Sequence, residues 1–176
     1  MRLIRWLSIF ALLVPAAFAE TAVLECTADT SIPMKKGGLD WSGHATQLHL
    51  PDAVLLNFGF PPARDWAVVK ATLLLHVASG AAPERLEIAV LQQPWDEESA
   101  PKLDLKNLRY LPAKIETKKD GWLAITVEPS LAEMLAGGKG EGLAIREPSP
   151  THECFFHSRE SLQYLPYLIV EGKPRK

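Results

Sequence analysis

The strongest constraint on the fold is a succession of short apolar runs separated by turn residues, with almost no helical pattern between them. Alternating and β-branched runs bounded by Gly and Pro are typical of β-strands. A parallel α/β sheet would need helices between its strands, so the pattern predicts an all-β sandwich. The expected strands cover residues 21–26, 47–50, 53–60, 67–79, 86–91, 121–127, 142–146 and 166–171.

Three local features refine this prediction. Residues 67–79 and 86–91 are expected to form a hairpin across the turn at 80–84. Residues 129–136 predict the single helix, with Ser130 as its cap and two glycines ending it. Residues 100–119 carry only weak periodicity, and their structure is left undecided.

The first nineteen residues have the pattern of a cleaved signal peptide. Arg2 and Arg5 precede a short apolar run, and Ala17-Phe18-Ala19 forms a small-x-small cleavage site. The run is too short for a comfortable membrane span. We therefore expect a signal peptide at 1–19 and one exported domain at 20–176, secreted or periplasmic and not membrane-spanning. Glu25 precedes Cys26 where a lipobox needs small residues, so a lipoprotein is not expected.

The charge of the expected mature chain argues against nucleic acid as a partner. Removal of Arg2 and Arg5 from the 19 basic residues leaves 17 against 21 acidic ones, a formal charge of −4. Phosphate binding depends on clustered Lys and Arg. The chain has no basic cluster larger than a Lys-Lys pair, such as Lys35-Lys36.

Cys26 and Cys154 are the only cysteines of the chain. An even pair in an oxidising compartment is most simply a disulfide. A bond that closes so long a loop would contribute about 4–5 kcal/mol on the chain-entropy model. Two free thiols, or half of a metal site, are the alternatives.

Several short motifs, in their order along the chain, resemble the DNRLRE-type secreted β-sandwich modules, a family allied to carbohydrate-binding modules. They span nearly the whole mature chain: Thr27-Ala28-Asp29-Thr30, Leu55-Leu56-Asn57-Phe58, Ala71-Thr72-Leu73-Leu74-Leu75, Trp95-Asp96, Gly121-Trp122 with Ile125-Thr126-Val127, Gly142-Leu-Ala-Ile-Arg146, and Phe156-His157-Ser158-Arg159-Glu160. The chain departs from the family at Asn57, where an Arg is usual, and in the loop 31–42, which lacks the Asn-Tyr-Gly of many relatives.

The resemblance implies an antiparallel two-sheet sandwich of jelly-roll type. It also implies a non-catalytic module that binds an envelope or extracellular polysaccharide. The alternative is a structural or adhesion module of the cell envelope that binds another protein.

Trp41 and Trp66 are the expected sugar-stacking residues, because sugars present C–H faces to exposed aromatic rings. Trp95 and Trp122 lie at strand ends, where packing at the edge of the core is expected. Arg159 is a further candidate ligand contact, since Arg binds carboxylates in a bidentate manner.

A structural role is preferred for Arg159 and Glu160. Adjacent strand residues point to opposite faces, so one of the two is expected to point inward and pair with a buried charge. Arg146 and Glu147, in the strand before, are the expected counter-charges.

The sequence predicts no catalytic residues and no cofactor. Ser158 and His157 are neighbours on an expected strand, where their side chains diverge. The histidines lack HxH or HExxH spacing, which gives no transition-metal motif. Calcium bound by oxygen ligands such as Asp29, Asp40 and Asp52 is the alternative, although no known spacing supports it.

Overall fold

The computed structural model describes residues 19–33, 46–50, 52–59, 66–150 and 152–174, with the backbone alone at Trp66 and Pro174. Ten strands and one α-helix account for most of these residues. The strands are β1 Glu20–Ile32, β2 Gln47–His49, β3 Ala53–Phe58, β4 Trp66–Gly80, β5 Leu86–Leu91, β6 Leu111–Lys119, β7 Trp122–Val127, β8 Gly142–Arg146, β9 Cys154–His157 and β10 Tyr167–Pro174. The helix is α1 Pro129–Ala136, and three short 3-10 helices are η1 Ala100–Lys102, η2 Leu105–Asn107 and η3 Arg159–Ser161.

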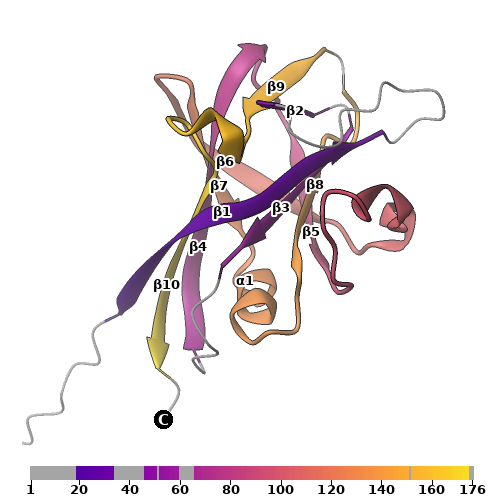
Figure 1. Ribbon diagram of the computed structural model, residues 1–176. Coiled ribbons are helices and arrows are strands. Elements are labelled where there is room, and N and C mark those ends of the chain that lie inside the picture. Colours follow the sequence, from indigo (N-terminus) through magenta and orange to yellow (C-terminus); the bar gives the residue numbers. More distant parts are fainter. Residues whose placement is uncertain (1–18, 34–45, 51, 60–65, 151, 175–176) are drawn as a thin grey trace, which may run out of the picture.

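Eight of the strands form a closed antiparallel barrel in the order β10-β1-β3-β8-β5-β6-β7-β4, and β4 returns to β10. The short strands β9 and β2 continue from the C-terminal part of β4 at the top of Figure 1. The predicted two-sheet sandwich of jelly-roll type is therefore wrong, although the prediction of a chain made mostly of strands is correct.

The barrel closes because two strands, β1 and β6, change partners along their length. They join the half of the wall made of β10, β4 and β7 to the half made of β3, β8 and β5. The first part of β1 pairs with β10 and its second part with β3, with a bulge between Cys26 and Ala28. In the same way β6 pairs first with β5 and then with β7, with a bulge between Ile115 and Thr117. Bulges bend a strand and let it pass from one sheet to another. Strand periodicity carries no information on such a passage.

The predicted hairpin of β4 with β5 is also wrong. β4 lies between β10 and β7, and its last residues pair with β9, so its edges are occupied. β5 instead pairs with β6 and β8 on the other half of the wall. The turn after β4 thus crosses between the two halves.

Leucine, isoleucine, valine and phenylalanine side chains fill the barrel. Phe156, Leu73, Leu123 and Ile125 are among the largest of the fully buried side chains. β7 alternates between buried and half-buried residues, as expected for a wall with an inner and an outer face.

β3 and β8 are instead buried on both faces. Outside them lies a second apolar cluster built on Trp95, Ala100 and Leu105. These residues belong to the segment between β5 and β6, which covers the outer face of the wall. Residues 100–119, whose structure was left undecided, fold as η1, η2 and β6.

The predicted helix is confirmed as α1, and its apolar face closes the lower end of the barrel in Figure 1. Ser130 is not its cap, because the helix begins at Pro129, whose missing N–H costs nothing at that position. Glu133 Oε1 accepts a hydrogen bond from the backbone N–H of Val68 at 3.0 Å and so ties α1 to β4. Within the described residues, no helix has the length and apolar character needed to cross a membrane.

Gly142→Ala is expected to destabilise the protein by about 2–4 kcal/mol. Gly142 has a φ of 147°, and a Cβ there would lie 2.6 Å from the carbonyl oxygen of Leu56 and 3.0 Å from Nε1 of Trp95. Gly138→Ala is the matched control: its φ is 67° and a Cβ added there would have no atom within 4 Å, so only the backbone cost of about 1 kcal/mol is expected. Urea unfolding measures both. Equal losses of stability in the two variants would contradict the close approach of Leu56 and Trp95 to Gly142.

Candidate functional site

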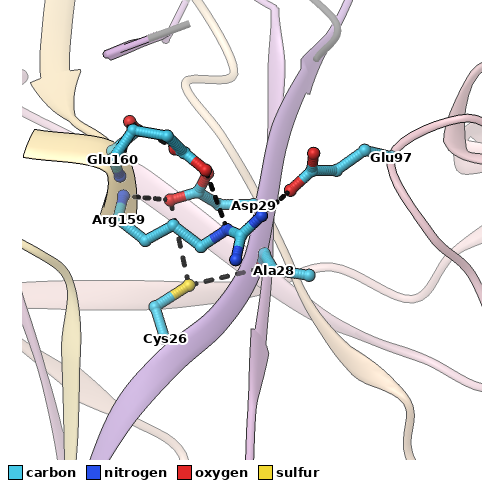
Figure 2. A network of polar contacts seen from close by, with 7 residues as sticks. Cys26, Ala28, Asp29, Glu97, Arg159 and Glu160 are labelled. Carbon is cyan, nitrogen blue, oxygen red and sulfur yellow. Dashed lines mark hydrogen bonds and ion pairs between the residues drawn. The ribbon is translucent and has the colours of Figure 1, made fainter. Parts of the chain in front are cut away.

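Arg159 lies in η3, directly after β9, and not in a strand as predicted. In this turn Arg159 and Glu160 need not point to opposite faces. Nε of Arg159 lies 3.0 Å from Oε1 of Glu160, and Ser158 fixes the same carboxylate by donating its hydroxyl to Oε2 at 2.8 Å. The two charged residues of the motif are therefore paired with each other (Figure 2).

Two further carboxylates reach Arg159 from distant parts of the chain. Asp29 Oδ2, on β1, accepts the backbone N–H of Arg159 at 2.7 Å. Glu97 Oε1, in the segment after β5, lies 2.8 Å from Nη2 of the guanidinium. We call Asp29, Glu97, Arg159 and Glu160 the Arg159 cluster. The cluster links β1, the segment between β5 and β6, and η3.

The expected counter-charges in the preceding strand are elsewhere. Arg146 of β8 pairs with Glu87 of β5: its Nη2 lies 2.7 Å and its Nε 2.8 Å from Oε2 of Glu87. Its guanidinium also lies 3.8 Å from the ring centre of Tyr110. Glu147 is buried, and burial raises the pKa of its carboxyl. Neither residue is the partner of Arg159 or Glu160.

The Arg159 cluster contains one guanidinium and three carboxylates. A proton on Asp29 reduces the net negative charge of the cluster. Asp29 is 4% exposed. Burial, and to a smaller degree the charges of Glu160 and Glu97, raise the pKa of its carboxyl to about 7, against the lowering effect of the Arg159 N–H. Asp29 thus holds its proton in acid and loses it near neutral pH.

The three carboxylates are also the set of described residues best placed to hold a metal ion. One oxygen from each lies within 4.8 Å of the other two. The guanidinium of Arg159 already neutralises Glu97 and Glu160, and Figure 2 shows it reaching between them. A cation would have to displace it, so the arrangement is that of an internal ion-pair network.

Asp29→Asn is expected to flatten the pH dependence of stability. The folded state raises the pKa of Asp29 from 3.8 to about 7. The stability contributed by its bound proton is therefore complete below pH 3.8 and is lost as the pH rises to about 7. Asn keeps an acceptor for the Arg159 N–H but cannot ionise. Urea unfolding measures the free energy of unfolding of both proteins. The difference between them should change in favour of the variant by a few kcal/mol as the pH rises from 4 to 8. A difference in free energy that does not change with pH would contradict this prediction.

Cys26 and Cys154 form no disulfide, so that prediction is wrong. Cys26 lies on β1, between β10 and β3, and its thiol lies 3.2 Å from the carbonyl oxygen of Ala28. Cys154 lies on β9 and pairs with Gly80 of β4. An even cysteine count cannot reveal that β1 and β9 have different neighbours in the wall.

Both thiols are expected to be unreactive in the folded protein. Burial raises the pKa of both: that of Cys154 to about 12, and that of Cys26 further still, with the help of Asp29. The thiolate is the reactive form. A thiol-specific disulfide reagent at pH 8 should label neither cysteine in buffer and both in urea. Absence of labelling in urea would mean that the two are linked.

A second group of side chains lies on the outer face of the wall, at the end where β9 is attached. Rings from β4, β7, β9, β10 and the turn after η3 gather there. We call them the aromatic surface: His76, Trp122, His157, Tyr164 and Tyr167. All five are partly exposed.

His76 lies at the centre of this surface. Its ring stacks on Tyr164 with centres 4.1 Å apart, meets the edge of Trp122 at 5.1 Å and lies 5.2 Å from His157. Its register partner across the strands is Trp122. Burial, and then the neighbouring His76, lower the pKa of His157, which favours the neutral form of the His157 ring at neutral pH.

This surface could be predicted from the sequence only in part. Trp122 was expected to pack at the edge of the core, yet alternation along β7 places Trp122 outward with Ala124 and Thr126, while Leu123, Ile125 and Val127 point inward. That alternation was a usable signal. The approach of Tyr164 was not, because it depends on the turn between η3 and β10.

Of the other tryptophans considered from the sequence, the structure describes the side chain of Trp95 but not those of Trp41 and Trp66. Trp41 lies outside the described residues, and Trp66 begins β4 with no side chain described. Trp95 is 9% exposed and donates its Nε1–H to the carbonyl oxygen of Glu141 at 2.9 Å, as a packed residue would.

The two candidate calcium ligands that the structure describes, Asp29 and Asp52, have different partners. Asp29 belongs to the Arg159 cluster, and Asp40 lies outside the described residues. Asp52 lies 2.9 Å from Nδ1 of His49, whose ring stacks on Phe155.

Ser158 donates its hydroxyl to Glu160, while the ring of its neighbour His157 belongs to the aromatic surface.

A comparison with protein-family models and one with curated protein sequences found no match to this chain. The resemblance to the DNRLRE-type modules stays a prediction.

Proposed function

We propose that the protein is a binding module that recognises a polysaccharide through its aromatic surface. The observation that carries this proposal is the gathering of five partly exposed rings on the outer wall, around the stacked pair His76–Tyr164. Pyranose rings present flat C–H faces, which pack favourably against aromatic rings. The polar tips of tyrosine, tryptophan and histidine supply hydrogen bonds at the rim of such a contact.

The position of these rings supports a preformed surface. His76, Trp122 and Tyr167 stand on three neighbouring strands of the barrel wall, β4, β7 and β10. Residues on packed strands lose little freedom on binding, and preorganisation increases affinity. The proposal moves the sugar contact from Trp41 and Trp66, expected from the sequence, to Trp122 and its neighbours.

Arg159 is a weaker candidate for ligand contact than the sequence suggested. Its side chain is 35% exposed, but its guanidinium is bound by Glu97 and Glu160. A carboxylated sugar would have to compete with both. We therefore assign Arg159 to the internal network and the ligand to the aromatic surface.

Trp122→Ala is expected to weaken polysaccharide binding about tenfold, since the stacking of one ring contributes about 1–1.5 kcal/mol. Affinity electrophoresis through gels cast with soluble xylan, glucomannan or alginate measures this as loss of retardation. Trp122→Phe keeps a ring and should retain part of the binding. Val69→Ala is the matched control, because Val69 is 59% exposed on β4 but is not part of the aromatic surface.

Two outcomes would overturn the proposal. One is that none of these polysaccharides retards the natural protein. The other is that Trp122→Ala and Val69→Ala lose retardation equally. Either outcome would favour the alternative of a structural module that binds another envelope protein.

A further inference from the structure

A groove of about 500 Å³ lies beside α1, away from the aromatic surface. Its floor is apolar and comes from β5, η2 with the following turn, β6 and α1. The apolar lining residues are Val90, Leu108, Leu111, Leu131 and Met134. Val90 and Leu131 are buried in the barrel core, so the floor is continuous with it.

The rim of the groove is polar and carries one charge. Its residues are Gln92, Asn107, Arg109 and Ser130, and none of the described residues that line the groove is acidic. Arg109 is exposed, and it makes no ion pair or hydrogen bond with its side chain among the described residues. Of the other three described arginines, Arg146 and Arg159 are paired with carboxylates, and Arg85 lines a separate pocket that also has Glu84 and Glu147 in its lining. A lone guanidinium beside an apolar floor is complementary to a ligand with one negative group and a hydrocarbon body.

We propose that this groove binds a small aliphatic carboxylate, with its chain along Val90, Leu131 and Met134 and its carboxylate on Arg109. The volume of 500 Å³ lies within the range of about 300–1,000 Å³ found for small-molecule sites, which also occur at the mouths of barrels. Met134 supplies a flexible, polarisable wall that adapts to such chains. The groove is independent of the proposed polysaccharide contact, because the two share no residue.

Titration of the isotope-labelled protein with sodium octanoate, followed by amide NMR, tests this inference. Saturable shifts are expected at Val90, Leu108 and Leu131. The neutral analogue 1-octanol should shift the same amides with about three- to tenfold lower affinity, the contribution of one charged hydrogen-bond pair at a partly exposed site.

Arg109→Gln should remove the preference for octanoate over octanol and leave octanol binding unchanged. Arg85→Gln is the matched control, because it removes the same charge from a residue that lines a separate, smaller pocket beside Glu147. An unchanged amide spectrum away from the groove verifies the fold of each variant. Shifts that are unsaturable or scattered over the surface, or equal losses in the two variants, would overturn the inference.

Discussion

The structure depends on the last strand, which bonds to two partners at once. β10 pairs with β1 on one side and with β4 on the other, and so joins the first strand of the domain to the long central strand (Figure 1). Closure removes the unpaired edges that an open sheet would present. It also encloses the apolar faces of all eight strands in one core.

The Arg159 cluster reinforces this closure from outside the core. η3 is the last helical turn before β10, and the hydrogen bond from the Arg159 backbone N–H to Asp29 fixes η3 against β1. Buried ion-pair networks contribute little net stability, but removal of one partner costs on the order of 3–5 kcal/mol because a charge is left unpaired. We therefore interpret the cluster as fixing the position at which the chain turns. The raised pKa of Asp29 follows first from the burial of its carboxyl, and to a smaller degree from the charges of Glu160 and Glu97.

The two proposed sites use different parts of the same wall. The aromatic surface lies where β4, β7 and β10 leave their outer faces uncovered, and alternation along these strands directs rings outward. The groove lies where the segment between β5 and β6 passes beside α1. One barrel can therefore carry the proposed sugar contact and the proposed groove for a hydrocarbon chain on separate elements.

The sequence alone determined the local structure: most strands, and the helix at Pro129–Ala136, follow from periodicity and from turn residues that act over a few positions. Tertiary structure decided everything that depends on which strands meet. The bulges in β1 and β6 turned an expected sandwich into a barrel, and separate places in the wall left Cys26 and Cys154 unlinked. Likewise, Glu97 and Asp29 reach Arg159 across 62 and 130 residues of chain. Periodicity reports the two faces of a strand, but not its neighbours, because pairing is selected by the packing of the whole core.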